Sequence, residues 1–268
     1  MQQLPPAILS ALNAAHVSWQ PTLLRGVEAV ASADPAYFPS LLAEEYLPTE
    51  GRLFAAFTQP MSAVRYVLVG EGPYPRAQSA TGFSFMDGAV GLLWSDAPGG
   101  GLSKPVNRAT SLRNFIKMLL VAEGRLAAEH TSGDALALIA LQARAIASPL
   151  IQTLADLQGK LLQQGFLLLN AALVFRPHVA PAKDARAWRP FMQHVLDALL
   201  QQAAVQGDAL PTLVLWGKIA EQLNGMAQIE CFPKAVSEHP YNLSFIANAE
   251  MQHNRLSENA LQRVLLVF

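Results

Sequence analysis

The sequence predicts an α/β protein, a three-layer α/β/α arrangement around a mostly parallel four-stranded sheet. Three short apolar runs, at residues 66–69, 166–170 and 213–217, are long enough for buried strands and too short for helices. Stretches with helical spacing separate these runs. Strands that alternate with helices are typical of a parallel sheet with right-handed crossovers.

The first 60 residues are predicted to be a helical region that packs onto the sheet. Residues 7–15 and 22–31 have apolar side chains at helical spacing. Ser40 precedes the sequence Leu-Leu-Ala-Glu-Glu at 41–45, so we expect it to cap a further helical turn.

Between the first two strands, the glycines at 99–101 predict a flexible tip. A helix is expected over residues 111–122, with Thr110 or Ser111 as its cap. Residues 124–165 are rich in Ala, Leu and Gln, which favours a helical insertion.

After the second strand, a loop at 176–189 leads into a predicted helix over 190–205, where Pro190 suits the first turn. Residues 227–232 read as a fourth strand, and a helix over 257–266 is expected to close the chain.

The composition is that of one compact domain covering residues 1–268. Apolar residues make up 51% of the chain and charged residues 15%, below the roughly 25% of an average soluble domain. No apolar run reaches the ~18 residues of a membrane span, and the N-terminus lacks a basic signal region, so we expect a cytoplasmic protein without membrane contact. The single cysteine, Cys231, excludes an internal disulfide and a cysteine-held cluster, and we expect it to be buried. No metal and no cofactor is predicted.

Positive charge is concentrated in two loop regions of a chain whose net charge is −1. Residues 71–117 and 170–189 together carry +5, which leaves −6 for the remainder. Such asymmetry can give a neutral protein a basic face for nucleic acid, although solvated loop charge is an equally good reading. Candidate phosphate contacts are Arg76, Lys104, Arg176 and Lys183.

Polar side chains follow the predicted strands where ligands bind in open α/β sheets, beyond the carboxyl ends. Glu71, Tyr74 and Arg76 follow the first strand, Asn170 ends the second, and the loop at His239 follows the fourth. We therefore expect Glu71, Tyr74, Asn170 and His239 to converge. An ordinary strand-to-loop turn is the alternative reading of the first loop.

Six short motifs follow one another in an order that resembles the uracil-DNA glycosylase superfamily, and most closely its first branch. They are Gly70-Glu71-Gly72-Pro73-Tyr74-Pro75, Gly82-Phe83-Ser84-Phe85, Ser111-Leu112-Arg113-Asn114, Leu167-Leu168-Leu169-Asn170, Val214-Leu215-Trp216-Gly217 and His239-Pro240-Tyr241-Asn242-Leu243-Ser244. Any one of these is a weak signal, but six in order over residues 65–244 are a strong one. The resemblance implies the same α/β fold and a base-excision repair function.

The resemblance also implies roles in base recognition. Phe85 would stack on a flipped-out base, and Asn170 would read the base edge through its paired donor and acceptor. Tyr74 would exclude the 5-methyl group of thymine. His239 would donate to the base oxygen on which negative charge develops. The structural alternatives are a core phenylalanine, a strand-end amide, a packed turn tyrosine and a surface histidine.

Contacts with DNA are implied in the same way. Leu243 would wedge into the stack that the base has left, and Ser244 would hold a phosphate with backbone amides. Ser111, at the helix start, is a further DNA-binding candidate beside Arg76, Arg176 and Lys183. DNA, single- or double-stranded, is thus the expected partner of a monomeric protein.

The departures from the family pattern fall on the chemistry. The family's catalytic aspartate is replaced by Gly72 and the neighbouring histidine by Pro75. Glu71 is one residue out of register, although its loop resembles the Gly-Glu-Ala-Pro loop of the iron–sulfur branch, whose four cysteines are absent here. Tyr241 and Asn242 replace the usual Ser-Pro of the wedge loop.

Two functions from the same fold therefore stay open. The first is hydrolysis of the N-glycosidic bond of uracil or a related damaged base in DNA, with Glu71 and His239 as catalytic residues and Gly72 in the substrate-binding loop. The second is binding of DNA or a base without turnover. A nucleotide-binding α/β enzyme is disfavoured, because the chain has no Gly-x-Gly-x-x-Gly or Walker loop.

Overall fold

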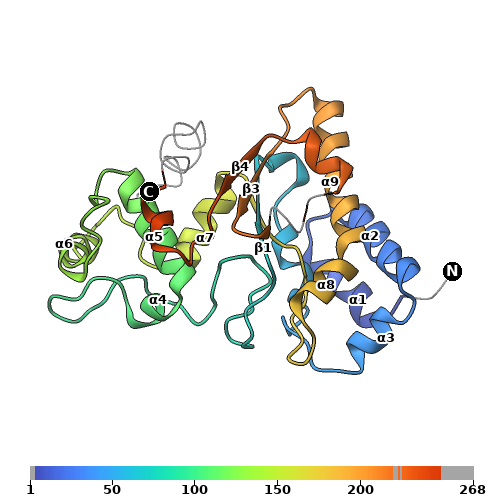
Figure 1. The fold of residues 1–268 in the computed structure, drawn as a ribbon, viewed down its shortest axis with the longest axis horizontal. Helices are drawn as coiled ribbons and strands as arrows, with labels where there is room; N and C mark the ends of the chain where they lie inside the picture. The colour runs from blue at the N-terminus through green and yellow to red at the C-terminus, as the bar shows by residue number, and fades with distance from the viewer. Residues whose placement is uncertain (1–3, 220–222, 224, 249–268) are drawn as a thin grey trace. The chain divides into compact units, whose positions relative to one another are not determined.

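The computed structural model describes residues 4–219, 223 and 225–248 (Figure 1). The helix predicted over 257–266 lies outside the described residues. The chain divides into two compact units. The first consists of Met1–Ser84, Gly165–Leu215 and Ile219–Lys234, and the second of Phe85–Gln164, Trp216–Lys218 and Ala235–Phe268.

A four-stranded sheet is formed by the described residues, in the order β2-β1-β3-β4. The strands are β1 (Tyr66–Gly70), β2 (Phe166–Asn170), β3 (Thr212–Trp216) and β4 (Lys234–Ser237). β1 runs parallel to both of its neighbours, with Gly70 opposite Asn170 and Val69 opposite Leu215. The predicted α/β class and the positions of the first three strands are confirmed.

The predicted fourth strand was misplaced. The 227–232 stretch begins with a 3₁₀ helix, η4 (Ala227–Cys231), and β4 starts after Pro233. Ile229 and Phe232 are the buried apolar side chains there, and a spacing of three suits a helical turn rather than a strand. Cys231 is exposed on this turn, contrary to the expectation that it is buried.

Short helices fill the N-terminal region of the first unit. They are α1 (Pro6–Ala11), η1 (Leu12–Ala14), α2 (Gln20–Ala33), α3 (Tyr37–Leu42), η2 (Arg52–Phe57) and η3 (Met61–Ala63). Ser40 does not cap a helix as predicted. Its backbone N–H already donates to the carbonyl of Ala36 at 3.0 Å, because α3 begins before it.

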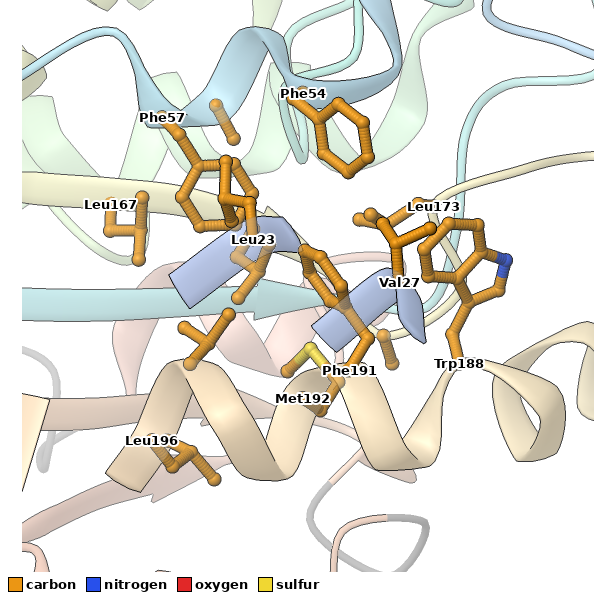
Figure 2. Packing of buried hydrophobic residues seen from close by; sticks show 14 of the residues in the cluster. Leu23, Val27, Phe54, Phe57, Leu167, Leu173, Trp188, Phe191, Met192 and Leu196 are labelled. Carbon is orange, nitrogen blue, oxygen red and sulfur yellow. The ribbon is translucent and has the colours of Figure 1, made fainter. Parts of the chain in front are cut away.

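The core of the first unit is built where α2 packs against α9 (Arg189–Gln206), the helix that follows α8 (Pro181–Ala187). Figure 2 shows the Phe191 side chain of α9 pointing toward α2, among fully buried rings. The helices can approach closely because Gly26 has no side chain. A Cβ at this position would lie only 2.7 Å from the Phe191 ring. The core thus ties the N-terminal helices to the chain that leaves β2.

The second unit contains α4 (Lys104–Arg108), α5 (Thr110–Ala122), α6 (Gly133–Ala143), α7 (Leu154–Gln163) and η5 (Leu243–Ala247). α5 packs against η5, which directly follows the loop at His239. Thr110 and Ser111 lie inside the first turn of α5, whose cap position is Ala109, so neither is the predicted cap. No helix of the described residues is long and apolar enough to span a membrane.

Candidate functional site

The loops that follow β1 and β2 leave the sheet side by side. The backbone N–H of Ala171 donates to the Gly70 carbonyl at 2.8 Å, and that of Ala172 to the Glu71 carbonyl at 3.1 Å. Hydrogen bonding therefore continues beyond the last strand residues, and Glu71 and Asn170 lie at adjacent strand ends.

Gly72, at the position of the family's aspartate, has room for a side chain. Its φ is not in the left-handed region, and a Cβ would lie 3.6 Å from the Ala172 carbonyl oxygen and 3.7 Å from the Ala172 Cβ, which is ordinary contact. A cavity of about 220 Å³ adjoins it and is lined by Glu71, Gly72, Pro73, Pro75, Ala172, Val174, Phe175, Arg176, Val179, Pro181 and Asp184. Neither backbone strain nor crowding at the described residues requires glycine here.

The two carboxylates on this cavity differ in their surroundings. Asp184 is buried and accepts hydrogen bonds from Arg176 Nη2 at 2.7 Å and Nε at 3.2 Å, and from the Tyr37 hydroxyl at 2.8 Å. Glu71 is exposed. Glu71 is therefore the lining carboxylate that remains accessible to a substrate.

Arg176 was predicted to contact phosphate, and the structure corrects this. Its side chain is only 4% exposed and is hydrogen-bonded to Asp184, with Nη1 3.7 Å from Glu44 Oε2. Its guanidinium lies 5.5 Å from the centre of the Tyr37 ring. The hydrogen bond to Asp184 raises the pKa of Arg176, and burial followed by the Asp184 charge raises the pKa of Tyr37. Arg176 holds the loop after β2 in place and is not available to DNA.

Asn170 is 2% exposed, and its Oδ1 has no hydrogen-bond partner among the described residues. Leaving a buried polar atom unpaired costs about 1–3 kcal/mol, so most buried polar atoms in folded proteins have a partner. Sequence reasoning placed this amide at a ligand site, and its unpaired oxygen is suited to a ligand donor.

Phe85 is positioned by Ser84, whose role the sequence analysis missed. The Ser84 N–H donates to the Leu168 carbonyl and its hydroxyl to the Leu68 carbonyl, both at 3.1 Å. The motif also needs Gly82, which has φ +88° and where a Cβ would be 2.3 Å from the Arg52 carbonyl oxygen. The motif is therefore pinned to β1 and β2 immediately before Phe85.

In the second unit, Phe85 itself adopts a left-handed conformation with φ +60°. Its half-buried ring meets Trp216 edge-on, with centroids 5.0 Å apart, and lies 6.1 Å from the His239 ring. A left-handed conformation costs a residue with a Cβ roughly 1–2 kcal/mol, and such strain is concentrated at functional sites. Phe85 and His239 therefore lie close together within this unit.

His239 is oriented by its own loop. Its Nδ1 accepts a hydrogen bond from the Tyr241 N–H at 3.0 Å, so the neutral ring carries its proton on Nε2 and presents a donor there. Gly217, the predicted strand stop, has φ +71°, and a Cβ on it would lie 2.6 Å from the His239 Cβ. Only glycine lets the end of β3 approach His239 this closely.

Asn114 holds the same loop and is a second residue whose role the sequence analysis missed. It is fully buried, and its Nδ2 donates to the Pro240 carbonyl at 2.7 Å, with the Tyr241 and Asn242 carbonyls at 3.4 and 3.5 Å. The motif containing Asn114 was recognised, but a role was assigned only to Ser111. Ser111 is half-buried in the first turn of α5.

The remaining predicted site residues lie at the surface or partly so. Leu243 is 69% exposed at the start of η5, which Phe245 anchors through a ring 5.0 Å from Trp216. Ser244, Arg76 and Lys183 are exposed, and Tyr74 is half-buried. No group of three or more His, Cys, Asp or Glu side chains within the described part of the chain could hold a metal ion.

Comparison with known proteins gives the family. No protein-family model matches the chain. The wild-type UNG crystal structure from Nitratifractor salsuginis shares 34% sequence identity, covers 99% of this chain and 100% of its own, and has a TM-score of 0.82. This chain belongs to the uracil-DNA glycosylase superfamily. The family and fold inferred from the six motifs are confirmed.

Two further members of the superfamily share less sequence with this chain. The uracil-DNA glycosylase of Corynebacterium glutamicum is 28% identical over 232 residues, which cover 85% of this chain and 81% of that protein. The mimivirus uracil-DNA glycosylase structure is 18% identical, covers 88% of this chain and 73% of its own, and has a TM-score of 0.50, so it shares the fold.

Proposed function

We propose that this glycosylase-superfamily protein hydrolyses the N-glycosidic bond between deoxyribose and uracil, or a related damaged base, in DNA. The observation that carries the proposal is the Asn170 amide, which is buried at a strand end with its Oδ1 unpaired among the described residues. A base edge offers the donor that this oxygen lacks. The relatives of this protein are named uracil-DNA glycosylase, which supports uracil as the base.

Base recognition would use three side chains. Asn170 would read the edge of a base flipped out of the DNA, and Phe85 would stack on its face, a contact worth about 1–3 kcal/mol. Tyr74 would exclude a 5-methyl group and so reject thymine. The left-handed backbone of Phe85 supports this role, because backbone strain is concentrated at functional sites.

Bond cleavage would rest mainly on His239. When the bond breaks, its electron pair leaves with the base, and the Nε2–H of His239 would donate to the base oxygen that gains negative charge. Water then adds to the cationic sugar through its oxygen, and the proton that it loses balances the one that neutralises the released base anion. Gly72 supplies no carboxylate to orient that water or oppose the cation, and Glu71 is the accessible acid beside it. General-base help is worth about 10²–10⁴ in rate, so we expect slow turnover.

DNA would be held by residues at the surface of the protein. Leu243 would wedge into the base stack. Phosphates would be contacted by Ser244, Ser111, Arg76, Lys104 and Lys183, whereas Arg176 is left out. A cytoplasmic monomer acting in base-excision repair completes the proposal.

Base release from oligonucleotides tests the activity. Single-stranded DNA with uracil or hypoxanthine, and duplexes with a thymine mismatch, are incubated with the protein, and abasic sites are revealed by alkaline cleavage. Slow release from uracil DNA is expected, and Asn170→Asp should abolish it because a carboxylate has no donor to offer. Asn13→Asp, at an exposed position, is the matched control and should retain activity.

Binding without turnover is the second candidate, and Gly72 is the observation that favours it. If the folded protein releases no base from any of these substrates but binds uracil DNA more tightly than thymine DNA, this function replaces the first. Binding itself should weaken with salt. Neutralising Arg76, Lys104 and Lys183 should flatten the plot of log K against log salt by about 0.7–0.9 for each lost contact.

A further inference from the structure

Two large exposed side chains lie on the segment that leads from His239 to the first residue of η5. Tyr241 is 68% exposed and Leu243 is 69% exposed. Asn242 between them is extended, with φ −79° and ψ 140°. The exposed tyrosine ring and the exposed leucine therefore lie within three consecutive residues of the chain, separated by one extended residue.

The backbone of Tyr241 is held on both sides. Its N–H donates to His239 Nδ1 at 3.0 Å, and its carbonyl lies 3.4 Å from the Nδ2 of the buried Asn114. The N–H of Asn242 donates back to the His239 carbonyl at 2.9 Å. The ring is thus carried on a constrained turn, which lowers the entropy lost when a flat ligand stacks on it.

We propose that Tyr241 is a stacking platform for a second, unstacked base of the bound strand, beside the nucleotide that Leu243 displaces. This inference rests on the proposed function and adds a contact with DNA that the proposed function does not include. The superfamily pattern has Ser-Pro at these two positions, so the platform is a property of this chain. A tyrosine ring can act as this platform because every base has a π-face, so stacking does not require a particular base.

The cation nearest the loop favours a nucleic acid strand as the occupant. Arg113 in α5 donates through Nε to Asn114 Oδ1 at 3.3 Å, which places its guanidinium beside the residue that holds the loop. Lys104 and Arg108 in α4 of the same unit are exposed. Glu238, the acid that precedes His239, is engaged by the Asn248 amide. An exposed aromatic ring on a loop whose anchoring residue is bound by an arginine is a combination that suits single-stranded nucleic acid, which is recognised by stacking together with positive charge.

The test measures binding of a fluorescein-labelled single-stranded 11-mer that carries an uncleavable tetrahydrofuran abasic analogue at its centre. Tyr241→Ala should raise Kd about 5-fold to 150-fold, because stacking is worth about 1–3 kcal/mol per base. Tyr241→Phe should stay within about twofold of wild type. The dependence on salt should be unchanged in both variants, because no phosphate contact is lost.

Leu141→Ala is the matched control, an exposed apolar residue of the same unit (63% exposed) outside the loop, and it should bind as wild type does. Circular dichroism and the unfolding midpoint confirm that each variant is folded. If Tyr241→Ala binds as tightly as wild type, or if its loss of affinity comes with a flatter salt dependence, the stacking role is wrong while the proposed function stands. If the folded wild-type protein binds none of the oligonucleotides, the proposed function fails and the platform fails with it.

Discussion

The Gly72→Asp variant tests whether the missing carboxylate limits the rate of base release by this protein. The backbone accepts the change, because φ at this position is outside the left-handed region and a new Cβ would lie at ordinary distances of 3.6 and 3.7 Å from Ala172. The adjoining cavity of about 220 Å³ leaves space for the carboxylate. Replacing a glycine whose conformation suits other residues also lowers the entropy of the unfolded chain. For glycine to alanine this stabilises a protein by about 0.4–1 kcal/mol, so the free energy of unfolding should not fall.

The expected gain follows from the role of the added group. General-base assistance contributes about 10²–10⁴ in rate when ideally placed, which corresponds to about 2.7–5.4 kcal/mol of activation free energy. Placement in a loop that did not evolve with the carboxylate is less than ideal, so at least a tenfold faster release of uracil is expected. Single-turnover release from single-stranded uracil DNA, with protein in excess, measures the chemical step.

Two further variants test whether the charge at position 72 matters and whether Glu71 already has the catalytic role. Gly72→Asn has almost the same shape without the charge and should not accelerate release. Glu71→Gln should abolish the wild-type activity if Glu71 has taken over the role. If Gly72→Asp is folded and binds DNA, yet releases uracil no faster than Gly72→Asn, a missing carboxylate is not what limits this protein, and the reasoning is refuted.

Three substitutions test the framework of the site. Gly217→Ala should destabilise the fold by about 1–3 kcal/mol in urea unfolding and slow base release, because it combines a left-handed φ with a clash against His239. Asn114→Ala should cost about 1–3 kcal/mol and weaken DNA binding, because it leaves buried loop carbonyls without their donor. Asp184→Asn should cost about 3–5 kcal/mol in the same unfolding measurement, because the buried Arg176 charge loses its hydrogen-bonded carboxylate and keeps only the more distant Glu44.

Each of these has an outcome that contradicts it. Gly207→Ala is the matched control for Gly217, since Gly207 also has a positive φ (+68°) but nothing within 4 Å of the place that a Cβ would occupy. Equal destabilisation of the two would mean that His239 is not crowded. Unchanged DNA affinity in Asn114→Ala would mean that the loop keeps its shape without the clamp. Wild-type stability in Asp184→Asn would show that Arg176 has another adequate partner.

Local sequence was sufficient for the strands and for the family. Short apolar runs stopped by Gly70, Asn170 and Gly217 predict buried strands because length and apolarity are properties of the segment itself. The six ordered motifs identified the superfamily for a similar reason, since each is a contiguous run of residues. The stretch at 227–232 failed because a short apolar segment is also compatible with a helical turn, and the tertiary contacts of Ile229 and Phe232 decide between the two.

The partners of the polar side chains were decided only by the tertiary structure. In the sequence Arg176 is a loop cation, and its burial depends on Asp184 and on Tyr37, which lies far away in the chain. The clamp from Asn114 to the Pro240 carbonyl spans 126 residues, so no local pattern could reveal it. By itself, the sequence determined the first three strands, the family and the absence of an aspartate at position 72. Which cation is exposed, which amide is unpaired and which loop is held depended on contacts between distant segments, because hydrogen bonds and burial are set by proximity in space and not by proximity in sequence.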